Sequence, residues 1–375
     1  MFVPVNEPVI PESSKQYLYE AVESWWISSA WKYINLFEEK FAQYIGIKHA
    51  ITVSNWTNAI HIALLWAWIQ KWDEVIVPSF TMMWTYLPIL YIWAIPIFVD
   101  VELDTYNIDV SKIEAKITPK TKAILPVHIY WQSVDMDPLL DIAQKHWLKV
   151  IEDAAEIHWW EYKWRKCWSL WDVSAFSFYG NKIITTWEWW MVCTNDDIIA
   201  YEMRKYKDLY HSDIRFIHEK IGYNYRMTNM QAAIWLWQIE HIDEFIEKKI
   251  KIAEFYNKKL KEFDWIILPI EKEYAKHVYR MYAIRIDQEK LWCDKDTFRA
   301  RLKEKWVDTR DFFYPPNTQP VLLNYYKDNG YTMHDEDMVT STQIWEDWLY
   351  LPSWLAITDE QLEYVYTVIK EITWK

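Results

Sequence analysis

Residues 49–69 read HAITVSNWTNAIHIALLWAWI, and this stretch gives the most direct indication of the fold. Residues 49–53 combine apolar and β-branched side chains, which is typical of a buried strand. The polar residues Ser54 and Asn55 then indicate a turn, and residues 57–69 have the apolar spacing of a helix. A strand that passes through a short turn into a helix is the first half of a βαβ unit.

The same alternation of short β-branched runs and helical stretches continues through the first two-thirds of the chain. It predicts an α/β fold in which helices flank a large, mostly parallel sheet, with ligands bound outside the carboxyl ends of the strands. We expect further strands at residues 74–77, 95–99, 122–127, 148–151, 173–178 and 190–193, and helices at 81–91 and 138–146.

The C-terminal part of the chain has a different pattern. From about residue 230 a charged amphipathic helix is expected to run to residue 263, and residues 277–286 are expected to form a strand. Further helices and loops follow, which is typical of a smaller α+β domain. We therefore divide the chain into a large domain of residues 1–240 and a small C-terminal domain of residues 241–375.

The composition argues against several classes of function. The net charge of −13 argues against a nucleic-acid partner and against binding to an anionic membrane surface. The three cysteines, Cys167, Cys193 and Cys293, lack metal-ligand spacing, and their odd number favours a reduced, cytoplasmic protein without a metal site. The apolar run at residues 60–69 is too short to span a bilayer, and the N-terminus lacks the pattern of a signal peptide.

Tryptophan and glycine are present in unusual numbers, 28 and 4 respectively. At average usage a chain of this length holds about 26 glycines. Several tryptophans, among them Trp56, Trp72 and those at 187–190, lie in polar, turn-like contexts that favour a residue without a Cβ atom. We hypothesise that the gene uses UGA for glycine and that most tryptophans except Trp26 stand for glycine. The alternative is a protein that is truly rich in tryptophan.

Three segments carry candidate chemistry at the ends of expected strands. They are SNWTNA at residues 54–59, EDAAE at 152–156 and SFYGNK at 177–182. Lys182 follows a strand and a Gly-Asn turn, and a lysine held in an apolar place can lose its proton and form an imine with an aldehyde. Asp153 ends an apolar strand, where a buried carboxylate is costly unless a cation meets it.

With glycine in place of tryptophan, these segments resemble the sugar aminotransferases of the DegT/DnrJ/EryC1/StrS family. The resemblance covers nearly the whole chain, and it is also carried by segments at residues 26–29, 162–166, 222–229 and 309–315. It implies the type I fold, which is the aspartate-aminotransferase fold of enzymes that depend on pyridoxal 5′-phosphate (PLP). It also implies that Lys182 forms the Schiff base with PLP and that Asp153 meets the protonated pyridine nitrogen.

The resemblance implies further contacts with the cofactor. Glu156 is expected near the other polar edge of the ring, and Met82 stands where relatives commonly carry an aromatic side chain that stacks on the ring. Residue 56, printed as Trp56, is expected to bind the phosphate together with Thr57 at a helix start and Ser177 at a strand end.

Other matching residues concern the second subunit and the substrate. Asn224 matches an asparagine that reaches the phosphate bound by the neighbouring subunit, which implies a homodimer with shared active sites. Arg226, Arg310, Tyr314 and Asn317 are expected to meet the sugar substrate, although a histidine is expected where Asn317 stands.

The reaction implied by the resemblance is amino transfer from glutamate to a nucleotide-linked 4-keto-6-deoxy sugar, for polysaccharide biosynthesis such as that of O-antigen. The segments around Lys163, Lys182 and Arg226 favour GDP-4-keto-6-deoxymannose, and a UDP- or dTDP-linked sugar is the alternative. A catalytically silent regulator with the PLP-enzyme fold is a second alternative, and the intact Lys182 and Asp153 argue against it.

Overall fold

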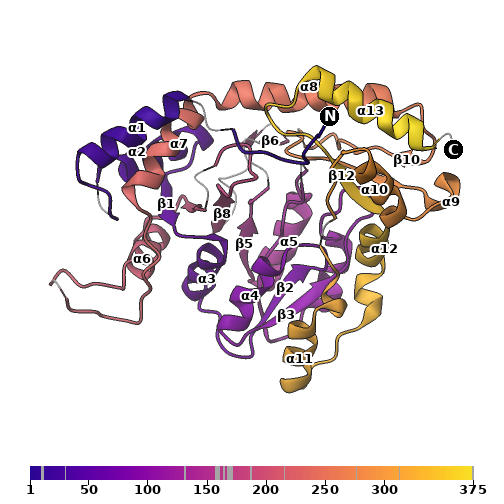
Figure 1. Cartoon of the computed structure of the whole chain (residues 1–375). Coiled ribbons are helices and arrows are strands. Elements are labelled where there is room, and N and C mark those ends of the chain that lie inside the picture. The colour runs from indigo at the N-terminus through magenta and orange to yellow at the C-terminus, as the bar shows by residue number, and fades with distance from the viewer. Residues whose placement is uncertain are drawn as a thin grey trace.

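The computed structural model describes residues 1–373 with the exception of 10–11, 30, 131, 157–160, 164, 167–171, 186–187, 215, 276 and 312. A seven-stranded sheet runs through the middle of the molecule (Figure 1). Across the sheet, the strands follow the order β1 (His49–Val53), β9 (Trp190–Thr194), β8 (Val173–Ser177), β5 (Lys149–Asp153), β4 (Thr121–Ile124), β2 (Glu74–Pro78) and β3 (Ile95–Val99).

The sheet is mostly parallel. Strands β8, β5, β4, β2 and β3 run in one direction, while β9 is antiparallel to both of its neighbours, β1 and β8. Each of the seven strands coincides with a run that the sequence predicts, to within a few residues at its ends. The predicted α/β fold with a large, mostly parallel sheet is therefore confirmed.

Alternate residues of the strands point into two apolar clusters, one on each face of the sheet. Ile51 and Val77 belong to the first cluster, whereas Ala50 and Ile76 belong to the second. Burial on both faces explains why these strands read as nearly continuous apolar runs. The first face is covered by α3 (Trp56–Trp66), α4 (Met83–Tyr91) and α6 (Asp197–Lys207), and the second by α1 (Glu12–Glu23), α2 (Lys32–Ile45), α5 (Met136–His146) and α7 (Asn229–Glu240).

The C-terminal part forms a smaller α+β unit around the antiparallel sheet β10-β11-β12. Its long helix α8 (Ile242–Leu260) packs against the C-terminal helix α13 (Asp359–Thr373), at the top of Figure 1. Its remaining elements are β10 (Ile266–Ile267), β11 (Tyr282–Ile286), β12 (Trp348–Leu351), α9 (Gln288–Leu291), α10 (Lys295–Glu304), α11 (Pro320–Asp328) and α12 (Val339–Asp347). A separate two-stranded sheet joins β6 (Glu161–Tyr162) to β7 (Arg165–Lys166).

The long helix predicted from residue 230 to residue 263 is in fact two helices. Helix α7 ends at Glu240 and α8 begins at Ile242, because the backbone of His241 has φ −118° and ψ 15° and leaves the helical path. The predicted division of the chain after residue 240 coincides with this break and stays a prediction.

The strand predicted at residues 277–286 is shorter than expected and begins at Tyr282. The preceding residues cannot extend it, because Tyr279 has a φ of 44° and its N–H donates to Nδ1 of His277 at 2.9 Å in a local turn. Among the described residues, none of the helices has the length and apolar character needed to cross a membrane.

The backbone supports the glycine hypothesis at positions far from one another. Of the fifteen non-glycine residues with positive φ in the described chain, eight are tryptophan. Trp147 and Trp292 take the left-handed conformation just after α5 and α9, as Gly46 does after α2. That position favours glycine, and a larger residue there is strained by about 1 kcal/mol or more. The other six are Trp25, Trp31, Trp68, Trp72, Trp93 and Trp306.

Candidate active site

A cavity of about 450 Å³ lies at the carboxyl ends of the central parallel strands, where the C-terminal part of the chain meets the large sheet. An α/β sheet is expected to bind its ligand at this edge. Seven of the predicted site residues line the cavity: Trp56, Met82, Glu156, Ser177, Lys182, Arg310 and Tyr314.

Lys182 is held inside this cavity by a tight turn after β8. Its backbone N–H donates to the carbonyl of Tyr179 at 2.9 Å, and its side chain is 4% exposed. Burial, and secondarily the positive charge of Arg280, lowers the pKa of Lys182 to about 7. A large fraction of this amine is therefore unprotonated near neutral pH, which is the form that attacks an aldehyde.

Asp153 ends β5 and is fully buried beside the cavity. Its Oδ2 accepts hydrogen bonds from Thr85 Oγ1 and from the indole Nε1 of Trp56, both at 3.0 Å, and its Oδ1 accepts from the N–H of Ala155 at 3.1 Å. Burial raises the pKa of Asp153 to about 7. All three donors are neutral, so a cation that reached this carboxylate would stabilise its charged form.

Glu156 connects Lys182 to a residue that sequence reasoning missed, Arg280. Oε1 of Glu156 lies 3.4 Å from Lys182 Nζ and 2.8 Å from Nη1 of Arg280, and Oε2 accepts from the N–H of Tyr130 at 3.0 Å. Arg280 also donates through Nη2 to Oδ1 of Asn181 at 3.0 Å. The turn that carries Lys182 is therefore held by two contacts with charged residues of the cavity wall. Lys182 itself contacts Glu156, and its neighbour Asn181 accepts a hydrogen bond from Arg280.

The expected phosphate contacts lie next to one another. Ser177 is fully buried at the end of β8 and lines the cavity, and Trp56 and Thr57 form the first turn of α3. Asn55 caps that helix by accepting the N–H of Asn58 at 3.0 Å. A helix N-terminus beside a buried hydroxyl is a favourable place for an anion.

Five predicted residues are not part of the cavity wall: Asp153 and Thr57, described above, and Asn224, Arg226 and Asn317. Asn224 is exposed and accepts a hydrogen bond from Nε of Arg226 at 3.1 Å, and Arg226 also pairs with Asp208 at 2.9 Å. Asn317 donates to Asp335 at 2.8 Å. The single chain therefore does not bring the last three side chains to the cavity, and their assigned roles stay predictions.

His128 lies beside the end of β5 and forms hydrogen bonds within the core. Nε2 of His128 lies 2.6 Å from Glu152, and its Nδ1 accepts the N–H of Val134 at 3.1 Å, so both ring nitrogens are engaged within the core. His158 and Trp187 lie outside the described residues. Within the described part of the chain, no group of three or more potential metal ligands comes together.

The residues in and beside the cavity match most of the chemical demands of PLP. Lys182 offers an amine to the aldehyde, Asp153 a carboxylate to the pyridine nitrogen, and Ser177 with the start of α3 offers donors to the phosphate. Trp56 does not fit, because its indole N–H already occupies Oδ2 of Asp153.

Comparison with known proteins agrees with this chemistry. The DegT/DnrJ/EryC1/StrS aminotransferase family profile matches residues 8–370. GDP-perosamine synthase of Caulobacter vibrioides is 37% identical over 372 residues, which cover 99% of this chain and 98% of that protein. GDP-perosamine synthase of Escherichia coli O157:H7 is 38% identical over 371 residues, with coverage of 99% and 98%.

A solved structure of the aminotransferase from Psychrobacter cryohalolentis has a TM-score of 0.90 at 27% identity, and covers 99% of this chain and 98% of that one. The matches thus extend over nearly the full length of both partners, and include the elements that build the cavity. The chain therefore belongs to the DegT/DnrJ/EryC1/StrS aminotransferase family, and it is a pyridoxal phosphate-dependent aminotransferase of the type I fold.

Proposed function

We propose that this enzyme transfers an amino group from glutamate to GDP-4-keto-6-deoxymannose and so makes GDP-perosamine. The observation that carries the proposal is the full-length similarity to GDP-perosamine synthases, at 37% and 38% identity, in a chain that retains Lys182 and Asp153 at one cavity. PLP, when bound, supplies the electron sink that such a transfer needs.

Lys182 is the residue that moves protons in this proposal. Its amine has a pKa of about 7, so it can accept and return a proton near neutral pH without a large energetic cost. Glu156 and Arg280 hold it in place, since Glu156 is shared between the two cations. Glutamate and the sugar use the same cavity in turn, so we expect ping-pong kinetics.

The mouth of the cavity has a cation suited to the diphosphate of a nucleotide sugar. Arg310 and Tyr314 line the cavity and are both exposed, and the backbone of Arg310 is fixed by the N–H of Tyr350, which donates to the Arg310 carbonyl at 3.2 Å. A guanidinium group binds phosphate oxygens in a bidentate manner. Arg310 and Tyr314 are therefore proposed to contact the substrate, and Arg226 and Asn317 to complete its site.

The proposal includes a homodimer. Residues 209–214 and 216–222 follow α6 and extend as an arm away from the body of the molecule (Figure 1). The arm carries the exposed apolar side chains Ile214, Phe216 and Ile221, which are 69%, 71% and 80% exposed. Apolar side chains gathered on such an arm are typical of a protein interface. We propose that a second copy covers the arm and that Asn224, at the base of the arm, then contacts the partner's cavity.

We place the reaction in the cytoplasm, in a pathway that supplies sugars for polysaccharides such as O-antigen. The absence of a membrane-crossing helix in the described residues is compatible with this location, and the product is an activated amino sugar.

A direct comparison of substrates tests the proposed function. The protein used is the glycine-restored protein, in which glycine replaces each tryptophan whose codon is UGA and Trp26 is kept. GDP-, UDP- and dTDP-linked 4-keto-6-deoxy sugars are assayed side by side with glutamate, and the GDP sugar is expected to have the highest kcat/KM. A clear preference for a UDP or dTDP sugar would leave the family intact and reject the perosamine assignment. Bound PLP without turnover of any sugar would favour the regulator.

A further inference from the structure

We propose that residue 56 is glycine in the protein as its own cells make it, and that the Trp56 indole occupies the place that the PLP ring takes in the enzyme. This inference rests on the proposed function, because it concerns the cofactor of that reaction. It goes beyond the composition argument, since it assigns a specific consequence to one tryptophan.

The first observation is the hydrogen bond between Trp56 and Asp153. The indole Nε1–H donates to Oδ2 of Asp153 at 3.0 Å, and Trp56 is 3% exposed. Asp153 is the carboxylate that pairs with the protonated pyridine nitrogen in the proposed enzyme. An indole N–H and a pyridinium N–H are both donors at the edge of a flat aromatic ring, so the two groups compete for the same oxygen.

The second observation is the position of the indole relative to Lys182 and Trp190. Nζ of Lys182 lies 5.6 Å from the centre of the Trp56 ring, and Trp190 stacks against that ring at 4.7 Å with an angle of 20° between the planes. The indole therefore fills the space between the reactive amine and Asp153. A cofactor that reacts with Lys182 while it contacts Asp153 requires this same space.

Trp190 and Trp189 add to the crowding of the site. Trp190 pairs with Val53 of β1 and Ser177 of β8, so its side chain enters the cluster next to the cavity. Trp189 is 7% exposed, and its indole N–H has no hydrogen-bond partner among the described residues. A buried donor without an acceptor destabilises the fold, and glycine at this position would remove it.

The eight tryptophans with positive φ supply an independent reason to expect glycine. They lie at helix ends and turns outside the cavity, where no cofactor argument applies. Trp56 itself is not among them. The proposal that residue 56 is glycine therefore depends on the space that the indole fills between Lys182 and Asp153, and on its hydrogen bond to Asp153.

Three proteins test the proposal. The first is the glycine-restored protein, the second differs from it only in retaining Trp56, and the third differs only in retaining Trp147. Trp147 is the matched control, because its side chain is 93% exposed and lies outside the cavity wall. Circular dichroism and thermal melting establish that all three are folded.

PLP binding is then measured without turnover, by titration of the visible absorbance band and by borohydride reduction followed by intact mass. We expect the first and third proteins to bind PLP with Kd values within about twofold of each other, and Trp56 to weaken binding at least about 100-fold. Equal binding by the Trp56-retaining protein would overturn the inference and leave the proposed function standing.

Binding of PLP by the glycine-restored protein without amino transfer to any keto sugar would instead reject the proposed function alone. If that protein binds no PLP at all, both proposals fail. A separate measurement decides the identity of the residue: the peptide that contains residue 56, isolated from the native cells, should have the mass of the glycine form. UGA codons are expected at most tryptophan positions, and a UGG codon at position 56 with tryptophan in the peptide would overturn the inference.

Discussion

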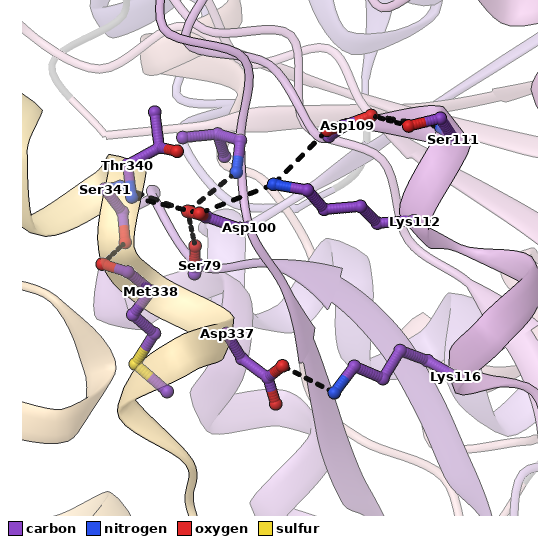
Figure 2. Close-up of polar contacts among 11 residues, drawn as sticks. Ser79, Asp100, Asp109, Ser111, Lys112, Lys116, Asp337, Met338, Thr340 and Ser341 are labelled. Carbon is purple, nitrogen blue, oxygen red and sulfur yellow. Dashed lines mark hydrogen bonds and ion pairs between the residues drawn. The ribbon is translucent and has the colours of Figure 1, made fainter.

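Two buried aspartates stand at the carboxyl ends of parallel strands in the same sheet, and their surroundings differ. Asp100 follows β3, and Asp153 ends β5. Figure 2 shows the carboxylate of Asp100 at the first turn of α12, where it accepts the N–H groups of Thr340 at 2.9 Å and Ser341 at 3.1 Å. Lys112 lies 3.6 Å away and supplies a positive charge. Asp100 therefore caps a helix of the C-terminal part and has a cation of its own.

Asp153 has donors but lacks a cation. It accepts from Thr85, Trp56 and the N–H of Ala155, and none of the described basic side chains forms an ion pair with it. Burial raises its pKa to about 7. The two carboxylates thus differ in the groups around them and not in their place at a strand end, and Asp153 is the one proposed to bind a cationic ligand.

The amine that shares the cavity with Asp153 should be indispensable. Lys182→Ala in the glycine-restored protein is expected to lower kcat by about 10⁴-fold or more, because both covalent attachment and proton transfer are lost. The visible band and the reducible covalent PLP should disappear. Lys163→Ala is the control, since Lys163 is half-exposed and pairs with Asp137 away from the cavity. Reducible PLP in the Lys182→Ala protein would assign the attachment to another lysine.

Substitution of the two aspartates should separate activity from structure. Asp153→Asn is expected to lower kcat by about 10²–10⁴-fold, because a neutral amide cannot keep a pyridine nitrogen protonated. Asp100→Asn should change kcat by less than about threefold, since Asp100 contacts α12 and not the cavity. Steady-state kinetics of both proteins check this contrast, and equal losses would show that both carboxylates serve the reaction.

The same two substitutions should have opposite effects on the stability of the PLP-free protein that retains Trp56, whose indole buries Asp153. The folded state holds the proton of Asp153 up to about pH 7, against an ordinary value of 3.8, so ionisation of Asp153 opposes folding progressively from about pH 4 upward. At pH 8 Asp153→Asn should therefore stabilise the apoprotein by on the order of 1 kcal/mol. Asp100→Asn should destabilise it by about 1–3 kcal/mol, because a helix cap is weakened.

Urea unfolding at pH 5 and pH 8 provides the measurement. The gain for Asp153→Asn should shrink at pH 5, where the carboxyl group is largely protonated in the folded protein. If Asp153→Asn is instead less stable at both pH values, the hydrogen-bond donors around Asp153 already stabilise its ionised form well.

The proposed sharing of sites between subunits is tested by mixing two inactive proteins. Asn224→Ala and Lys182→Ala each damage a different subunit's contribution, so a heterodimer keeps one intact site out of two. After subunit exchange, about a quarter of the parent activity should return, because half of the dimers are mixed. Native mass spectrometry confirms the exchange. Mixed dimers without activity would place both residues in the same subunit's site.

The sequence predicts those strands and strand-end residues that a local pattern of side chains identifies. The strands at His49–Val53 and Ile95–Val99 were predicted to the residue, because each is a short, mostly apolar run that is followed by a polar residue. Lys182 and Asp153 follow such strands, so the sheet edge that they share was predictable. The break at His241 was not, since the residues on both sides continue the helical spacing of apolar side chains.

Contacts between distant segments could not be read from the chain. Arg280 and Asn181 are 99 residues apart, and Asp100 and Thr340 are 240 apart. No local pattern distinguishes Arg280 from a surface arginine, because the signal is the buried position that the fold gives it. The bond between Trp56 and Asp153 is of the same kind, and the position of Trp56 became informative only when both side chains were placed.

Arg280 should adjust the pH range in which the cavity can take up PLP. Its positive charge acts with burial to lower the pKa of Lys182, and it also pairs with Glu156, whose negative charge raises that pKa. Arg280→Met removes the charge and frees Glu156, so the pKa of Lys182 should rise. An amine with a higher pKa stays protonated to higher pH, so it attacks an aldehyde only at a correspondingly higher pH.

The rate of PLP uptake by the apoprotein, measured by stopped-flow absorbance from pH 6 to pH 10, reports this change. The pH at which the uptake rate is half-maximal is expected to be about one pH unit higher for Arg280→Met than for the parent, which is the glycine-restored protein without this substitution. That shift corresponds to a change of about 1.4 kcal/mol in the free energy of protonating Lys182. Arg280→Lys retains the positive charge and should restore most of the parent midpoint, although it loses the geometry that engages Glu156 and Asn181 together. If Arg280→Met takes up PLP more slowly but with the same pH midpoint as the parent, Arg280 has a packing role only. Its charge would then have no part in setting the protonation of Lys182.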